Sequence, residues 1–304
     1  MRDEDRTLDS DIPELREYLK RGDKVLDIGC GPGTITLDVA SAVNPGEVIG
    51  IDPFEDRIQS AREIQSAREL ATEATPTGNI SFEVGDSHKL DFPDDSFDVV
   101  YSHTVLHFLL DPVSALKEQK RVAKKGGWVI ASGVRDQLVS PRYPACPHWF
   151  KVYQAFDRYQ QSFLRESQSG GDDPVAYINR TSLSPWQRKS NPSGTIYYYD
   201  PSAGRKCVDW FSHAGLDDLQ IKVKAEYLQY PGSEYMEHDV RDLILLDDPE
   251  PGFEKQVASW TEKMIAEGFL DEETLKRAKE EVRAWYKDPR AFNFWILVFV
   301  AGRA

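Results

Sequence analysis

Asp27-Ile28-Gly29-Cys30-Gly31-Pro32-Gly33-Thr34-Ile35 is the stretch of sequence that decides the fold. It follows the apolar run Lys24–Leu26 and leads into residues 36–40, an order typical of a strand, a tight glycine turn and a helix. The glycines let the backbone pass close to a ligand, because no Cβ stands in the way. A dinucleotide fingerprint would need Gly or Ala where this chain has Thr34, and Asp27 would repel a pyrophosphate. We therefore expect a ligand with a cationic end, and not NAD.

Further predicted strands follow this loop. Asp52 comes directly after the second strand, 19 residues beyond Gly33, which is close to the spacing at which an acid meets ribose hydroxyls in a nucleotide-binding βαβ unit. Strands that alternate with helices predict a parallel, doubly wound α/β sheet. The strands predicted after the first are residues 47–51, 80–84, 96–101 and 128–131, and the third and fourth strands of the chain end at Gly85-Asp86-Ser87 and Ser102-His103.

A well-marked helix precedes the fifth strand. Asp111 is placed as its N-cap and Pro112 in its first turn, both of which are favoured positions for these residues. Gly126-Gly127 is expected to follow the last helical turn.

Taken together, these landmarks resemble the class I S-adenosylmethionine-dependent methyltransferases, in particular the ubiquinone-biosynthesis-like small-molecule group, which includes many enzymes of secondary metabolism. The resemblance covers residues from about 12 to 132 in order. It implies a Rossmann-like, doubly wound seven-stranded sheet whose last strand is antiparallel, with S-adenosylmethionine (SAM) as the cofactor. The landmarks that carry it are Val25–Ala40, Ile49–Asp52, Gly85–Ser87, Phe97–Ser102 and Arg121–Gly127.

The resemblance also implies roles for individual residues. Asp27 and the glycine loop would frame the methionine end of SAM, and Asp52 would accept hydrogen bonds from the ribose hydroxyls. Pro53 and Phe54 would form an apolar wall for adenine. The complete cofactor-binding set implied is Asp27, Gly29, Cys30, Gly31, Asp52, Pro53, Asp86, Ser87, Ser102, His103 and Thr104.

The last members of this set lie beyond the third and fourth strands. Asp86 would accept from the adenine amino group, and the Ser87 backbone would meet a ring nitrogen. His103 and Thr104 would face the methionine and the reactive methyl. His103 is the candidate catalytic residue, because imidazole is the side chain best tuned to move protons near neutral pH; the alternative is a structural histidine. His107 is expected to pack in the core.

The second half of the chain predicts helices over residues 147–166 and 270–285, and a shorter one from Asp200-Pro201 to Gly215. Two late strands, from Leu219 and over residues 294–300, are expected to complete the sheet. We predict one methyltransferase domain, residues 1–304. Its core would comprise residues 12–133, 200–230 and 291–304, with helical lid insertions at 134–199 and 231–290.

Composition sets further limits. The net charge of −14 argues against a nucleic-acid partner, although it does not exclude a small acidic substrate. Three widely spaced cysteines fit a reducing cytoplasm and neither a disulfide framework nor a zinc site, and no metal is expected. The charged N-terminus has no secretory or mitochondrial signature, and no apolar run is long enough to span a membrane. Cys30 inside the loop is expected to be a small side chain that fits, and not a nucleophile.

The function expected from the resemblance is SAM-dependent methyl transfer to a small, hydrophobic metabolite, by in-line attack on the sulfonium methyl with catalysis by proximity. Two alternatives stay open: an enzyme of the same fold that binds SAM but catalyses other chemistry, such as cyclisation, and a regulatory SAM-binding protein. The sequence does not identify the acceptor or its reacting atom, and it leaves a homodimer open.

Overall fold

The computed structural model describes residues 5–71, 79–109, 111–136, 142–169, 200, 202–229, 261–288 and 290–304. The chain forms two compact units. Unit 1 comprises residues 1–135, 187–224 and 297–304, and unit 2 comprises residues 136–186 and 225–296. The two segments predicted as lids lie partly outside the described residues, and their role as lids stays a prediction. Within the described part of the chain, no helix has the length and apolar character needed to cross a membrane.

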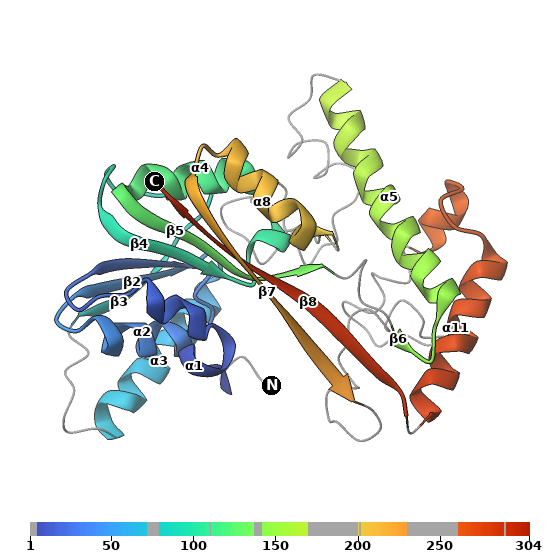
Figure 1. The fold of residues 1–304 in the computed structure, drawn as a ribbon, viewed down its shortest axis with the longest axis horizontal. Helices are drawn as coiled ribbons and strands as arrows, with labels where there is room; N and C mark the ends of the chain where they lie inside the picture. The colour runs from blue at the N-terminus through green and yellow to red at the C-terminus, as the bar shows by residue number, and fades with distance from the viewer. Residues whose placement is uncertain are drawn as a thin grey trace. The chain divides into compact units, whose positions relative to one another are not determined.

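A parallel sheet forms the centre of unit 1 (Figure 1). Its five parallel strands lie in the order β3-β2-β1-β4-β5, so the order reverses between β1 and β4. In open α/β sheets, ligands bind beyond the carboxyl ends of the strands at such a switch point. The predicted parallel sheet is confirmed. The strands are β1 (Lys24–Ile28), β2 (Glu47–Asp52), β3 (Ile80–Val84), β4 (Phe97–His103) and β5 (Ala123–Asp136).

Three later strands extend the sheet: β6 (Arg142–Tyr143), β7 (Asp217–Gln229) and β8 (Phe292–Arg303). The Gly126 amide donates to the Ala304 carbonyl at 3.0 Å, and the Ala304 amide donates to the Gly127 carbonyl at 3.1 Å. The end of β8 therefore lies beside the start of β5, which confirms the predicted antiparallel last strand. β7 pairs with β8. β6 also pairs with β8, in the antiparallel direction, and it brings the number of strands in the sheet to eight, one more than predicted.

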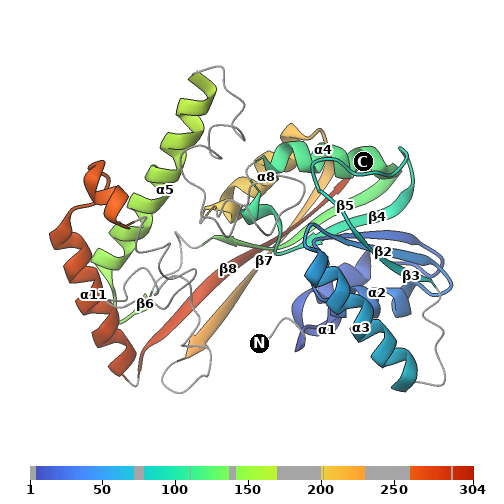
Figure 2. The ribbon, with the colours of Figure 1, turned by 180° about the vertical axis from the view of Figure 1, so that it is seen from behind.

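Helices cover both faces of the sheet in unit 1, as Figures 1 and 2 show from opposite sides. One face carries α1 (Leu8–Asp11), η2 (Pro13–Glu17), α2 (Thr34–Val43) and α3 (Glu55–Ala71), and the other carries η3 (Leu106–Phe108), α4 (Pro112–Val122) and α8 (Ala203–His213). With both faces covered, most residues of the central strands are buried. This explains why consecutive residues such as Val25-Leu26 in β1 and Val99-Val100 in β4 are apolar and do not alternate with polar residues.

The start of α4 is as predicted, and its end is not. The Asp111 side chain accepts a hydrogen bond from the Ser114 amide at 2.9 Å, and Pro112 occupies the first turn. The helix ends at Val122, however, and Gly126-Gly127 lies inside β5. The prediction that these glycines follow the last helical turn was wrong, because the chain enters the sheet as soon as the helix ends.

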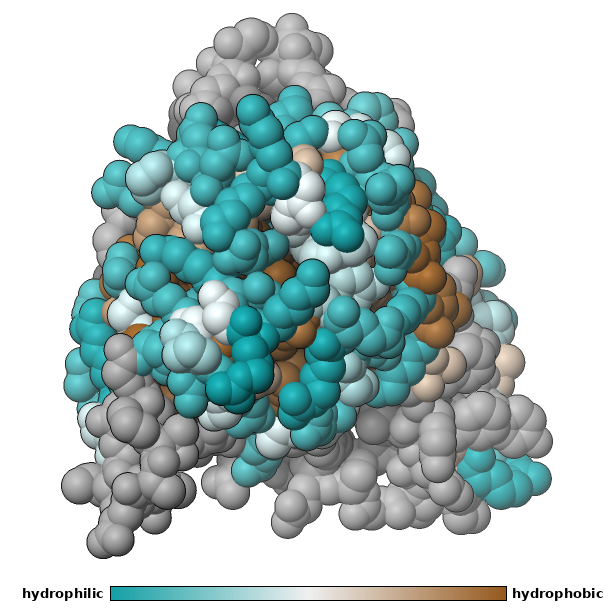
Figure 3. Space-filling model, turned by 60° about the vertical axis from the view of Figure 1, so that its left-hand side comes forward, coloured by the Kyte–Doolittle hydropathy of each residue, from teal (hydrophilic) through white to brown (hydrophobic). Residues whose placement is uncertain are grey.

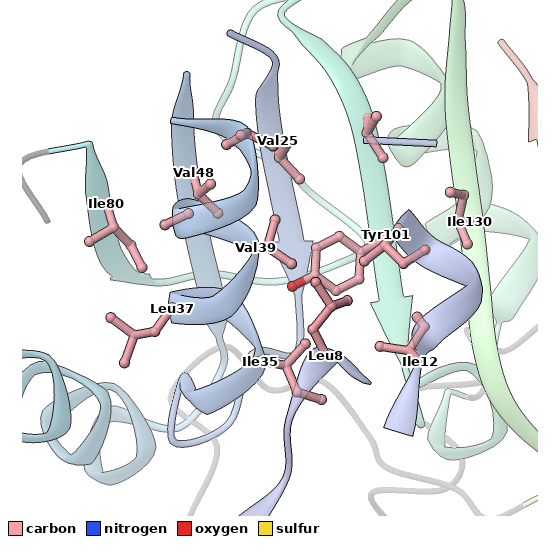
Figure 4. Packing of buried hydrophobic residues seen from close by; sticks show 14 of the residues in the cluster. Leu8, Ile12, Val25, Ile35, Leu37, Val39, Val48, Ile80, Tyr101 and Ile130 are labelled. Atoms are coloured by element: carbon pink, nitrogen blue, oxygen red, sulfur yellow. The ribbon is translucent and has the colours of Figure 1, made fainter. Parts of the chain in front are cut away.

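The core of unit 1 joins the sheet to the N-terminal segment. Leu8, Ile12 and Leu15 are fully buried and belong to the same apolar cluster as Val25 and Tyr101. Figure 4 shows Leu8 and Ile12 beside the ring of Tyr101. The first turn of this segment is fixed by a capping box, in which the Thr7 side chain accepts from the Ser10 amide. The N-terminal segment is therefore part of the hydrophobic core.

Unit 2 contains two long helices, α5 (Pro147–Ser169) and α11 (Glu272–Lys287), which confirm the predicted helices in these regions. Glu281 of α11 joins them: its Oε2 accepts from the His148 amide at 2.8 Å and from the Trp149 amide at 3.2 Å. Amides in the first turn of a helix have no partner within the helix, so this carboxylate caps α5. Trp149 and Tyr153 are buried, with ring centroids 4.5 Å apart.

The surface agrees with the composition. Hydrophilic residues cover most of the face that Figure 3 presents, and apolar residues reach it only in smaller areas. This distribution is expected for a chain in which 29% of residues are charged.

Candidate functional site

The glycine loop between β1 and α2 has a backbone that only glycine adopts readily. Gly29, Gly31 and Gly33 all have positive φ angles, of 73°, 55° and 75°. A Cβ on Gly33 would stand 2.6 Å from the Phe82 ring, and one on Gly29 would overlap Val105. Phe82 and Val105 therefore pack closely against the loop, and the loop's conformation requires residues that have no side chain.

Asp27 places a buried carboxylate under this loop. It is 3% exposed, and its Oδ2 accepts from the Thr36 hydroxyl at 2.7 Å and from the Tyr101 hydroxyl at 2.6 Å. Burial raises the pKa of Asp27 to about 6. The two hydrogen bonds act to lower this pKa, and the charge of Asp52 acts to raise it. A cation placed beside Asp27 would favour its ionised form.

Asp52 is the last residue of β2, and its side chain is hydrogen-bonded to the glycine loop. Only 5% of its surface is exposed; Oδ2 accepts from the Gly31 amide and Oδ1 from the Phe54 amide, both at 3.0 Å. Burial raises the pKa of Asp52, while these amides and the nearby charge of Arg57 act in the opposite direction. Each carboxylate oxygen accepts more than one hydrogen bond, so capacity for ribose hydroxyls remains.

Asp86 and Ser87 follow β3 in a tight turn. Oδ1 of Asp86 accepts from the His88 amide at 2.9 Å, and its carbonyl accepts from the Lys89 amide at 3.1 Å. Ser87 is buried. The turn lies at the same edge of the sheet as Asp27 and Asp52, since β1, β2 and β3 are parallel neighbours.

The end of β4 lies two residues later than predicted, so Ser102 and His103 belong to the strand itself. Ser102 is buried, and its hydroxyl lies 3.5 Å from the Ile130 carbonyl. Thr104 has a φ of 58°, which is unusual for a β-branched residue, and its hydroxyl donates to the His103 carbonyl at 2.7 Å. Such a backbone is a source of strain, and strained residues concentrate at functional sites.

His103 is held in a dry environment. The residue keeps part of its surface exposed, but its Nδ1 is covered and has no hydrogen-bond partner among the residues that the structure describes. Burial lowers the pKa of His103 to about 3, and the charge of Arg6 contributes. Desolvation disfavours the imidazolium, so the low pKa does not favour a base that works near neutral pH. The role of His103 as catalytic residue stays a prediction. His107 is buried as predicted, and burial also lowers its pKa.

Cys30 lies inside the glycine loop between two buried carboxylates. Burial raises the pKa of Cys30, and the neighbouring carboxylates Asp27 and Asp52 raise it further. A thiol that stays protonated is a poor nucleophile. Cys146 and Cys207 are buried and form no disulfide among the described residues. No group of His, Cys, Asp or Glu side chains suited to a metal ion occurs among the residues that the structure describes.

The structure brings Asp27, the glycine loop and Asp52 into direct contact, and places the Asp86 turn and Ser102–Thr104 at the carboxyl ends of neighbouring strands. Sequence reasoning missed the two hydroxyls that hold Asp27. Tyr101 gave a weak signal, because its hydroxyl is a polar group next to the apolar residues of β4. It also missed Arg6, whose Nη1 donates to the Thr104 hydroxyl at 3.4 Å; no local pattern marks a residue that contacts another 98 positions away.

Comparison with known proteins gives the same result as the geometry. Residues 19–168 match the family model described as a methyltransferase domain. The chain is 30% identical, over 92% of its length and 84% of the relative's, to an uncharacterised methyltransferase of Schizosaccharomyces pombe. It is 33% identical to a demethylmenaquinone methyltransferase of Staphylococcus aureus, over 45% of this chain and 52% of that protein.

A solved structure supports the fold. A crystal structure of a Bacillus halodurans protein named as a methyltransferase superposes with a TM-score of 0.52 at 15% identity, covering 97% of this chain and 98% of that one. Full-length similarity to a methyltransferase, a SAM-type glycine loop and a doubly wound sheet with an antiparallel last strand lead to one conclusion. The chain belongs to the class I S-adenosylmethionine-dependent methyltransferases.

Proposed function

We propose that this enzyme transfers the methyl group of SAM to a small-molecule acceptor at the carboxyl ends of β1 to β4. The observation that carries the proposal is the pair of buried carboxylates, Asp27 and Asp52, on either side of a loop of positive-φ glycines. Asp27, Gly29, Cys30 and Gly31 would hold the methionine end, where the sulfonium and ammonium groups are cationic.

The remaining contacts are assigned by strand position. Asp52 and Pro53 would hold ribose and one face of adenine, and Asp86 with Ser87 would hold the adenine edge. Ser102, His103 and Thr104 would line the space beside the transferable methyl, because they end β4 next to the switch point.

The residues present fit SAM. Burial raises the pKa of both carboxylates, and the charge of Asp52 raises the pKa of Asp27 further, so a cationic ligand would favour their ionised forms. The Gly31 amide is already held by Asp52, so little ordering of the loop is needed on binding. When bound, SAM supplies an electrophilic methyl carbon on a sulfonium.

The chain's own contribution to catalysis would be alignment and exclusion of water. An imidazole with a pKa near 3 is neutral at physiological pH and a weak base. We therefore assign His103 the role of orienting the acceptor by hydrogen bonding. This replaces the role of general base that its sequence position had suggested.

The acceptor's apolar body is also part of the proposal. The α5 aromatics Trp149, Tyr153, Phe156 and Tyr159 are buried within unit 2, so they do not supply an exposed apolar wall. Residues 134–199 and 231–290 are proposed to act as lids. A cytoplasmic location is proposed from the three widely spaced cysteines, which suit a reducing compartment.

The test has two stages. Calorimetry should detect binding of SAM and S-adenosylhomocysteine, and no comparable binding of NAD. The protein is then incubated with methyl-labelled SAM and a metabolite extract, and the products are analysed by mass spectrometry. A labelled metabolite with S-adenosylhomocysteine supports methyl transfer. A product without the label would indicate cyclisation or related chemistry, and binding with no product from any extract would indicate a regulatory protein.

A further inference from the structure

His88 is a polar side chain of the candidate site to which the cofactor roles above give no task. It is the second residue after Asp86, the proposed acceptor for the adenine amino group. Its side chain is 21% exposed, and that of Asp86 is 23% exposed. Both side chains are therefore mostly covered, yet a ligand that lies over the turn can still reach them.

Two hydrogen bonds join His88 to the same oxygen of Asp86. The His88 amide donates to Oδ1 at 2.9 Å, and Nδ1 of the imidazole lies 3.1 Å from Oδ1. A carboxylate accepts and does not donate, so Nδ1 carries the hydrogen. The amide bond is the turn in which an Asp side chain binds the backbone two residues further on. The imidazole bond is additional, and it restrains the last torsion of the aspartate, which otherwise has a broad range.

The chain that follows His88 is fixed from α4. Arg121 donates to the carbonyls of Leu90 and Phe92, both at 2.8 Å. The same guanidinium donates to Glu118, whose Oε2 accepts from the Leu90 amide at 3.0 Å. The backbone after His88 is thus held by contacts that do not involve the imidazole. Removal of the imidazole should therefore change the orientation of the neighbouring carboxylate and not the path of the chain.

We infer that His88 is a positioning residue: its imidazole orients the Asp86 carboxylate for the amino group of adenine, and so sets the preference of the cofactor site for that base. This inference rests on the proposed function, in which Asp86 receives the amino group. A carboxylate that is oriented before binding loses less conformational freedom when the ligand arrives. A carboxylate has about four acceptor positions, so Asp86 can accept from a ligand in addition to its bonds within the protein.

Two ligands that differ in one group test the inference. S-adenosylhomocysteine carries the amino group, and its analogue with purine in place of adenine lacks that group and keeps the ring nitrogens. Calorimetry should show that the parent binds S-adenosylhomocysteine about tenfold more tightly than the purine analogue, as expected for a hydrogen bond to a charged acceptor. The ratio of the two dissociation constants measures the amino contact, because a loss of ribose or methionine contacts affects both ligands alike.

Substitutions of His88 should change this ratio. His88→Leu removes the donor, and the ratio should fall about threefold to tenfold. His88→Asn places an amide N–H as many bonds from the backbone as Nδ1 is, and it should keep the ratio within about twofold of the parental value. Leucine and asparagine side chains have nearly the same shape, so the comparison isolates the hydrogen bond. If His88→Leu does not fold, His88→Ala takes its place.

Two further variants serve as controls. His213 also lies close to an aspartate, Asp209, at 3.2 Å, but on the exposed surface of α8. His213→Leu should therefore leave the ratio unchanged. Asp86→Ala removes the acceptor itself and should bring the ratio close to one, which sets the lower limit for the His88 variants. Thermal unfolding of each variant shows whether it is folded at the temperature of the titration.

The outcomes separate positioning from a structural role. If His88→Leu weakens the binding of both ligands and leaves the ratio unchanged, the role is structural and the inference is overturned. An equal fall of the ratio in His88→Leu and His88→Asn would also overturn it. A parent that binds S-adenosylhomocysteine and its purine analogue equally would refute the inference without affecting methyl transfer. A parent that binds neither would be a failure of the proposed function, so binding of S-adenosylhomocysteine is measured first.

Discussion

The Tyr101 hydroxyl donates to Oδ2 of Asp27 at a distance of 2.6 Å, and the two residues are buried on neighbouring strands. These residues lie 74 positions apart in the chain. The same carboxylate oxygen accepts from Thr36 on α2. One acidic group thus links β1, β4 and α2 at the proposed cofactor site. If the proposal is correct, the stability of this region and its affinity for a cation depend on the same atoms.

Loss of the tyrosine hydroxyl should weaken the fold. Tyr101→Phe leaves the buried Asp27 carboxylate with one fewer donor, and should lower the free energy of unfolding by about 1–3 kcal/mol. Tyr18→Phe is the control, because its hydroxyl donates to Gln220, a residue exposed to water. Denaturant titration should give a clearly larger loss for Tyr101→Phe, and equal losses would contradict this account.

The stability contribution of Asp27 should depend on pH. Its folded pKa of about 6 lies above the ordinary value of 3.8, so the favourable contribution is complete below pH 3.8 and is lost as pH rises through 6. Asp27→Asn removes this penalty. Relative to the parent, the variant's free energy of unfolding should increase by roughly 3 kcal/mol as pH rises from 4 to 7.5. Over the same range, the variant's affinity for S-adenosylhomocysteine should fall relative to that of the parent. A stability difference that is constant with pH would contradict the prediction.

Asp52→Ala should weaken SAM binding by about 1.5–3 kcal/mol, the usual range for hydrogen bonds to a charged partner. Besides the ribose contact, it removes the acceptor for the Gly31 amide. Asp98→Ala serves as the control: Asp98 binds the Lys24 amide and Lys124 at the opposite end of the strands, so stability should fall without a change in affinity. Unchanged SAM affinity in Asp52→Ala would exclude the ribose role.

Substitutions at His103 should separate orientation from proton transfer. His103→Gln keeps hydrogen bonding and should retain kcat within about tenfold, whereas loss of a general base costs about 10²–10⁴. His103→Ala should raise KM for the acceptor and leave SAM affinity unchanged. The parent's kcat should be flat from pH 6 to 8, since the imidazole pKa of about 3 lies outside that range. A kcat that rises with a pKa near 6.5 would restore the general base.

The glycine loop should be intolerant of side chains. Gly22 lies outside the loop and serves as the control. Gly22→Ala introduces strain at a φ of 90° with no atom within 4 Å of the new Cβ, and should lower the free energy of unfolding by about 1–2 kcal/mol. Gly33→Ala combines similar strain with overlap of the Phe82 ring, and should cost a further 1–3 kcal/mol. Thermal unfolding of the two variants measures the contribution of packing. Equal costs would show that strain alone acts at Gly33.

Local patterns were sufficient for most of the fold. The apolar runs of β1 to β4 and the Asp111 cap are signals carried by adjacent residues, and they located the sheet and its carboxyl ends. β6 could not be predicted, because two residues show no periodicity. The end of α4 was misplaced, because a glycine pair stops a helix in some contexts and lies in a strand in others.

The chemistry of the site was less accessible from sequence. The position of Asp27 followed from the glycine loop, but its two hydroxyl donors and its raised pKa depend on tertiary packing. The same applies to His103. Its place at the end of β4 was predicted, while burial and the approach of Arg6 determine its protonation, and no sequence pattern records burial.

The buried N-terminal segment has a consequence for assembly of the enzyme. Leu8 and Ile12 pack beside Tyr101, whose hydroxyl holds Asp27, and Arg6 reaches Thr104 from the same segment. This segment can reach its packed position only after β4, nearly one hundred residues later in the chain, has been made. Folding of the proposed cofactor site therefore depends on contacts between parts of the chain that are far apart in sequence, and removal of residues 5–12 should disturb the Tyr101–Asp27 pair that these residues cover.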